Sequence, residues 1–353
     1  MTRRRLLPLA LLLAACASST PRIPDAWLQV EQAPRITSLS IDAAGKVTTN
    51  PGRAVNLSAI QARGGRIYNG DKALTPRFEA IDSLDVSQAR GEVVFSARRD
   101  KDFDIGLVST DGSDVHWVPN DPADELQPRW APRGNKISFI VRTKSGDVVR
   151  TVHVPTATAL AVDFPYATIH ALAWDPPAER YAVSYSTPDA SDRVEVTKYG
   201  GEERRMAVPP AVRLSVDLQP FARDAMMLRP LDVAYGEKLP LVLWVGDFDW
   251  SDARAALLRN ARAACVIARR APDEALWKSI RETPWLDPSR VYLVGAADPG
   301  ALRSIVGDAA VASGRYRVTG NVVSVPPAVV QSFAAGFIAD QLKRNSPPNG
   351  SSR

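Results

Sequence analysis

A repeat of 44 residues constrains the fold of this 353-residue chain more than any other feature. Trp130 and Trp174 lie 44 residues apart in segments that align, and Phe95 and Phe139 show the same spacing one unit earlier. Each unit holds short, alternating apolar runs separated by turn residues, which is the pattern of antiparallel strands joined by hairpins. Strand units with a period of about 40–45 residues predict the stacked sheets of a β-propeller.

The best-formed unit also carries recognisable motifs. Residues 104–110 form an alternating strand, and Asp111-Gly112 supplies the positive φ angles of a tight type I′ turn. Together with residues 126–139, this unit resembles the TolB-type propeller repeat, which also builds the propellers of prolyl oligopeptidase family peptidases. The resemblance covers about residues 80–210, although residues 175–179 depart from it because they lack the usual turn.

The segment before residue 80 is open to two interpretations. Residues 36–47 could form a further blade, whereas residues 51–59 resemble the strands of bacterial immunoglobulin-like domains. Three or four units are few for a closed ring, which typically has about 4–8 blades. We therefore expect a partial ring, or a ring whose open edge is covered by a second domain.

The second half of the chain has a different rhythm. Four apolar strands are expected at residues 239–246, 264–268, 290–295 and 316–325, and helices at 251–264, 271–280, 299–311 and 327–344. Strands and helices that alternate in this way favour a parallel sheet covered on both faces. The predicted fold class is thus a β-propeller-like repeat domain followed by a small three-layer α/β domain with a parallel sheet.

The order of these two halves resembles the prolyl oligopeptidase family as well. There, a G-x-S-x-G elbow carries the nucleophile, and here the matching stretch has Gly295, then Ala297 at the serine position, then Asp298. Gly246 and Asp247 stand in the segment that the resemblance assigns to the oxyanion hole, where a carboxylate would repel the developing charge. No histidine follows Ala297, so the general base of the fold is missing.

Three readings of function follow from this pattern. The first is a degenerate hydrolase-like protein, not an enzyme, that binds a protein or peptide partner. The second is an active serine hydrolase or peptidase with an unrecognised active site, in which Ser304 would be a displaced nucleophile. The third is a structural spacer of the cell envelope.

The N-terminus predicts export and lipid attachment. Three arginines at residues 3–5 precede a short apolar run at residues 6–13, as in a secretory signal peptide. Residues 13–16, Leu-Ala-Ala-Cys, resemble the lipobox of bacterial lipoproteins, so Cys16 is the expected lipid attachment site. The expected location is the cell envelope, at the periplasmic side of the outer membrane if the bacterium is diderm.

Charge and residue spacing exclude several other classes. Removing residues 1–15 leaves 41 basic and 39 acidic side chains, so we expect no nucleic acid partner. The spacings of His116, His153 and His170 suit no zinc motif, and the calcium-like series at Asp100 lacks the required glycine and glutamate. We therefore expect neither a metal nor a cofactor. Cys265, in an apolar run, is expected to be a buried small residue.

The sequence thus divides into five segments. These are a lipoprotein signal peptide (1–15), a lipid-anchored linker (16–34), a repeat region (35–235), a truncated hydrolase-like domain (236–344) and a disordered tail (345–353).

Overall fold

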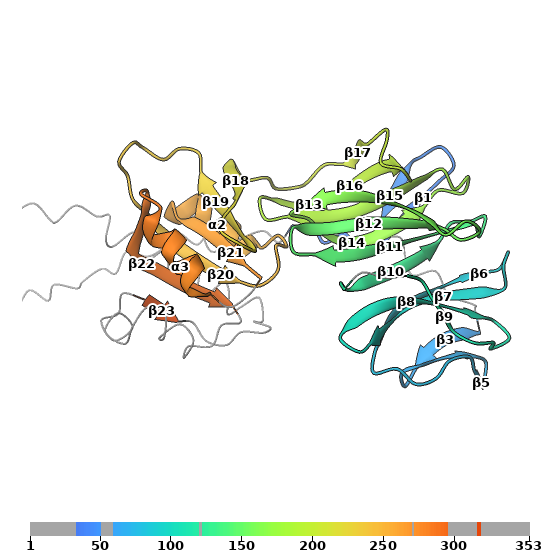
Figure 1. The fold of residues 1–353 in the computed structure, drawn as a ribbon. Helices are drawn as coiled ribbons and strands as arrows, with labels where there is room; N and C mark the ends of the chain where they lie inside the picture. Colours follow the sequence, from blue (N-terminus) through green and yellow to red (C-terminus); the bar gives the residue numbers. More distant parts are fainter. Residues whose placement is uncertain (1–32, 51–58, 120–121, 270–271, 296–315, 319–353) are drawn as a thin grey trace, which may run out of the picture.

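A computed structural model describes residues 33–50, 59–119, 122–269, 272–295 and 316–318 (Figure 1). Most of the described chain is β-sheet. The strands are β1 (Leu39–Ile41), β2 (Val47–Thr49), β3 (Ile60–Arg63), β4 (Arg66–Asn69), β5 (Lys72–Ala73), β6 (Ile81–Ser87), β7 (Glu92–Arg99), β8 (Asp102–Ser109), β9 (His116–Trp117), β10 (Glu125–Trp130), β11 (Lys136–Thr143), β12 (Gly146–His153), β13 (Thr158–Pro165), β14 (Thr168–Trp174), β15 (Arg180–Thr187), β16 (Ala190–Lys198), β17 (Arg205–Val208), β18 (Val216–Pro220), β19 (Ala225–Pro230), β20 (Leu239–Val245), β21 (Ala264–Ala268), β22 (Leu286–Gly295) and β23 (Tyr316–Val318). The described helices are α2 (Asp252–Ala261) and α3 (Glu274–Glu282).

The 44-residue repeat is confirmed by three four-stranded antiparallel sheets, which we call the repeat sheets: β6–β9, β10–β13 and β14–β17. Their second strands, β7, β11 and β15, begin at residues 92, 136 and 180. Each of these strands has at least five consecutive buried residues, because neighbouring sheets cover both of its faces. Phe95 packs over Gly106 on the paired strand, where a Cβ atom would lie only 2.4 Å from its ring.

The segment before residue 80 divides between the two ends of this stack (Figure 1). The three-stranded sheet β3–β5 packs on the first repeat sheet through Ile60 and Ile67. The hairpin β1–β2 instead packs on the third repeat sheet, where Ile41 contacts the cluster that contains Val194. The hairpin therefore covers the face of the last repeat sheet, far from its neighbours in the sequence.

The second half of the chain forms a six-stranded sheet with the order β18-β19-β21-β20-β22-β23. Strands β20 to β23 pair in parallel, as the alternation of strands and helices predicts. Strands β18 and β19 add an antiparallel edge, although the sequence grouped residues 216–230 with the repeat region. The apolar pattern of these two strands is that of a hairpin, and it does not show which sheet the hairpin joins.

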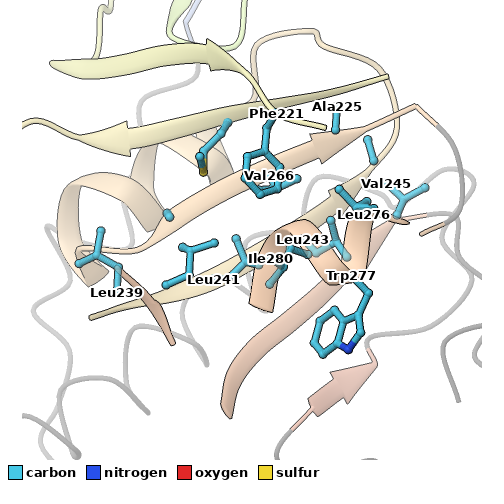
Figure 2. Packing of buried hydrophobic residues seen from close by; sticks show 14 residues of the cluster. Phe221, Ala225, Leu239, Leu241, Leu243, Val245, Val266, Leu276, Trp277 and Ile280 are labelled. Carbon is cyan, nitrogen blue, oxygen red and sulfur yellow. The ribbon is translucent and has the colours of Figure 1, made fainter. Parts of the chain in front are cut away.

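Each face of this sheet packs against one described helix. Leu257 and Leu258 of α2 lie against Trp244 and Cys265, whereas Trp277 of α3 lies on the opposite face, shown in Figure 2. Alternate residues of β20 and β21 enter the two clusters, since successive side chains of a strand point to opposite faces. Helix α3 begins with an Asp273 cap, whose carboxylate accepts the Leu276 N–H at 2.8 Å.

Several predicted features lie outside the described residues. These are Cys16, Ala297, Asp298, Ser304 and the helices expected at 299–311 and 327–344. In the part of the chain that is described, no helix combines the length and the apolar character needed to cross a membrane.

Candidate functional site: the junction between the two sheet systems

The loop between β20 and α2, residues 246–251, contains the predicted oxyanion segment. Arg254 of α2 lies beneath it and is 4% exposed. Its guanidinium donates to the carbonyl of Asp247 at 3.0 Å and to the carbonyl of Asp249, and it stacks over the Trp244 ring. The Gly246 N–H donates to the Ala268 carbonyl at 2.9 Å. The backbone of the loop is thus held by structural hydrogen bonds.

Asp249 of this loop meets the third repeat sheet in a polar group that we call the junction cluster. It consists of Arg35, His170, Ser186, Asp192 and Asp249, which come from the segment before β1, from β14, β15 and β16, and from the β20–α2 loop. Arg35 Nη1 donates to Asp249 Oδ1 at 2.9 Å and to Asp192 Oδ1 at 3.3 Å. Arg35 Nη2 also donates to the Trp250 carbonyl at 3.0 Å.

Ser186 and His170 form the one serine–histidine contact in the cluster. His170 Nε2 lies 2.9 Å from Ser186 Oγ, and Ser186 Oγ donates to Asp249 Oδ1. The Trp250 N–H donates to the same Oγ at 3.4 Å. In a hydrolytic triad the serine proton goes to histidine, whereas here it goes to a carboxylate and the buried Oγ accepts from its neighbours.

The electrostatics of the cluster keep Asp249 ionised. Burial alone would raise the pKa of Asp249, but hydrogen bonds from His170, Arg35 and Ser186 lower it below its usual range. Asp192 completes the cluster and is almost fully buried, and its Oδ2 accepts the Ile36 N–H at 2.6 Å. A carboxylate with so low a pKa is a poor general base at neutral pH, and it serves better as an anchor for cations.

His170 reaches this cluster because of a β-bulge. The β14–β15 register shifts between Ile169 and Ala171, so His170 is the extra residue. Such a bulge redirects a side chain out of the regular alternation. The equivalent strands β6 and β10 are also irregular near their starts, at Asp82 on β6 and at Gln127 and Pro128 on β10. His116 and His153, the other two histidines of the chain, lie on strands β9 and β12.

A second set of contacts joins the six-stranded sheet to the β11–β12 turn. Arg269, after β21, donates to the Thr143 carbonyl, and Lys144 pairs with Asp224 at 3.6 Å. The Asp247 carboxylate is exposed and interacts electrostatically with Arg142 and Arg269. The two sheet systems are therefore docked by charged groups at two places.

A cavity of about 360 Å³ lies at the C-terminal end of α2, whereas Asp249 precedes the N-terminal end of this helix. Its walls are the segment before β18, the end of β19 and the end of α2. The lining residues are Arg213, Leu214, Ser215, Val216, Pro230, Leu231, Asp232, Leu258, Arg259 and Arg262. We call this cavity the arginine pocket, because its lining holds three arginines and one acidic residue, Asp232, together with apolar residues.

The charges in the arginine pocket are only partly balanced. Arg262 pairs with Glu237 at 3.1 Å, and Arg213 lies 3.9 Å from Asp189. Arg259 is exposed, and no ion pair is seen for it within the described residues. Leu231 is 64% exposed at the same place. The pocket thus offers both cationic and apolar contacts to a ligand.

The structure brings some of the predicted site residues together. Gly295 ends β22 beside Val245, directly before Gly246, so the predicted elbow segment and the predicted oxyanion segment start at the same edge of the sheet. Cys265 is buried, as expected, and burial raises the pKa of its thiol to about 12. Trp130 and Trp174 are core residues of their strands.

The sequence matches no protein-family model and no curated protein. Solved structures of peptidases are similar in their broad arrangement. Oligopeptidase B from Trypanosoma brucei with covalently bound antipain is 12% identical, with a TM-score of 0.48, over 66% of this chain and 41% of that one. Puromycin hydrolase is 13% identical, with a TM-score of 0.47, over 64% and 42%.

Prolyl oligopeptidase B from Galerina marginata is 10% identical, with a TM-score of 0.45, over 61% of this chain and 37% of that one. The chain thus spans about two fifths of the length of the solved structures it resembles. This mostly β protein is similar in structure to peptidases of the prolyl oligopeptidase type, at a level that concerns the fold alone.

Proposed function

We propose that this protein is a non-catalytic lipoprotein of the cell envelope that binds a protein or peptide partner. In this proposal Cys16 carries the lipid, the repeat sheets form part of a TolB-like propeller, and the six-stranded sheet belongs to a degenerate hydrolase-like domain. The membrane is the second partner, reached through the lipid on Cys16. The anchored body faces the periplasm if the bacterium is diderm.

The junction cluster is the observation that carries the non-catalytic part of the proposal. Its serine, Ser186, is buried and donates a hydrogen bond to Asp249, and Arg254 of α2 holds the β20–α2 loop through backbone carbonyls. These groups hold two sheet systems together, which leaves them unsuited to attack a carbonyl carbon. Polar residues of catalytic type are thus used for docking.

The arginine pocket is where we place the partner. Its volume is within the range of about 300–1,000 Å³ that is usual for ligand pockets. Exposed Arg259 and Arg213 favour acidic groups, and Leu231 favours an apolar side chain. A peptide segment with acidic and apolar residues has the matching chemistry.

A photo-crosslinking experiment tests this placement. We expect p-benzoylphenylalanine at Leu231, in the pocket, to capture one partner reproducibly from the native envelope. The same group at Tyr235, which is fully exposed but outside the pocket lining, should capture much less. Arg259→Glu should reduce capture at Leu231 several-fold, because it reverses the charge that faces an acidic segment.

Arg223→Glu is the matched control for the charge. Arg223 is exposed in the β18–β19 turn, at the opposite end of that hairpin from the pocket residues Val216 and Pro230. If no partner is captured at Leu231, or if Arg259→Glu leaves the capture unchanged, the partner does not bind in the arginine pocket. No partner at either position would favour the structural spacer instead.

One observation favours a second candidate function, a serine hydrolase. The 2.9 Å contact between His170 Nε2 and Ser186 Oγ places a base beside a hydroxyl group. We nevertheless expect a fluorophosphonate probe to leave the purified full-length protein unlabelled, since this Oγ is buried and donates to Asp249. A known serine hydrolase serves as the positive control. Labelling that disappears in Ser186→Ala, or in Ser304→Ala, would establish the enzyme.

A further inference from the structure

The outer strand of the second repeat sheet differs from the other outer strands. β13 is eight residues long, whereas the corresponding strands β9 and β17 have two and four residues. Residues 158–161 are all exposed, and residues 158–162 carry no charge. Soluble proteins usually keep such edges short or charged, because an exposed edge recruits another strand.

The register shows which main-chain groups of β13 are free. The Val154 N–H donates to the Asn135 carbonyl, so the even residues of β12 bond to β11 and the odd ones bond to β13. Through the β12–β13 pairing, Leu160 and Val162 bond to β12. Ala159 and Ala161 therefore direct their N–H and C=O groups outward.

A side-chain contact supports this assignment. The Asp163 carbonyl, next in the outward series, accepts a hydrogen bond from Arg204 at 3.2 Å. Arg204 belongs to the β16–β17 turn and closes the edge at that point. No hydrogen bond to the outward groups of Ala159 or Ala161 is seen within the described residues, so the open edge is centred on Leu160.

We propose that two copies of this chain pair antiparallel through β13, with the two-fold axis beside Leu160. Ala159 then faces Ala161 of the second copy, and each such pair exchanges both N–H···O bonds. Leu160, which is 49% exposed in the single chain, then faces Leu160 of the second copy, and both side chains become buried. The free groups are symmetric about Leu160, as an isologous contact requires.

Charge agrees with a second copy as the occupant. In this register Thr158 faces Val162 of the second copy, so no like charges oppose each other between residues 158 and 162. The small side chains of Ala159 and Ala161, on the other face of the sheet, let two strands approach without a clash. The result is one continuous eight-stranded sheet across the dimer.

Disulfide trapping in the full-length protein tests the proposal. Leucines that face each other across the axis, in a non-hydrogen-bonded pair, have Cα atoms about 4.5 Å apart, within the range of about 4.4–6.8 Å that a disulfide spans. Leu160→Cys should therefore give a reducible band of twice the mass on oxidation. Leu231→Cys, at a leucine elsewhere that is 64% exposed, should not, and the wild type controls for Cys16 and Cys265.

A second variant separates pairing from folding. Ala161→Pro removes an outward N–H that makes no hydrogen bond to β12, so the chain should still fold. The dimer, however, loses the hydrogen bonds that this N–H donates between the two copies. We expect the wild type to sediment as a dimer at micromolar concentration, and Ala161→Pro as a monomer with the same circular dichroism spectrum. A monomeric wild type, equal bands for the two cysteine variants, or a Leu160→Cys disulfide with a different protein would each overturn self-pairing.

Discussion

Replacing Arg254 with methionine is expected to lower the free energy of unfolding by about 2–4 kcal/mol. Methionine fills a similar volume, but it cannot donate to the carbonyls of Asp247 and Asp249 that Arg254 now serves. Both part-buried carbonyls would lose their guanidinium donor, and the loop would lose two of the hydrogen bonds that hold it. Burial also lowers the pKa of Arg254, so the native state already bears the cost of holding this cation, and these hydrogen bonds offset it.

Denaturant titration followed by tryptophan fluorescence measures this effect, since Trp244 and Trp250 flank the loop. Arg259→Met is the matched control, because it makes the same change on the exposed side of α2 and should alter stability by less than about 0.5 kcal/mol. If the two variants were equally stable, the loop would not depend on Arg254, and the proposed structural use of the β20–α2 loop would be wrong.

The sequence predicts the periodic parts of the fold well. The 44-residue spacing places β7, β11 and β15, and the apolar runs locate β20, β21 and the start of the parallel sheet. These features can be predicted because the periodicity of a strand and the residues of a turn depend on neighbouring positions in the sequence. The sheet that a short strand joins depends on contacts with residues far away in the sequence. The hairpin β1–β2 and the pair β18–β19 could therefore not be assigned to their sheets from the sequence.

The candidate site was less predictable for the same reason. Arg35 and Asp249 are 214 residues apart, and no motif links them. His170 joins them only because a bulge turns its side chain, and a bulge leaves little trace in an alternating strand. Residues 246 and 247 do follow a strand, β20, as the apolar run predicts, but the hydrogen bonds of this loop to Arg254 depend on tertiary packing.

The sign of the pH dependence at the junction follows from Asp249. Its folded pKa lies below the value of about 3.9 for an unfolded aspartate. A depressed folded pKa contributes stability above the unfolded pKa, and this contribution is lost as pH falls through the folded pKa. We therefore expect the docking at Asp249 to be constant between about pH 5 and 8 and to weaken only below about pH 4.

Asp249→Ala removes this contribution at neutral pH and leaves Arg35 without its nearest carboxylate. Breaking such a partly buried pair should cost about 2–4 kcal/mol of docking free energy. The segment between β17 and β18 should then open, and trypsin should cleave after exposed Arg213 at least tenfold faster at pH 7.5.

Asp217→Ala supplies the comparison, because Asp217 is an exposed acid on β18. It should leave the cleavage rate unchanged. Trypsin is inactive in acid, so pepsin digestion or the change in tryptophan fluorescence on acidification extends the measurement below pH 4. The wild type should approach Asp249→Ala there, as protonation removes the same charge. An equal rate for the wild type and Asp249→Ala at neutral pH would mean that the contacts of Arg269 with the β11–β12 turn dock the two sheet systems on their own.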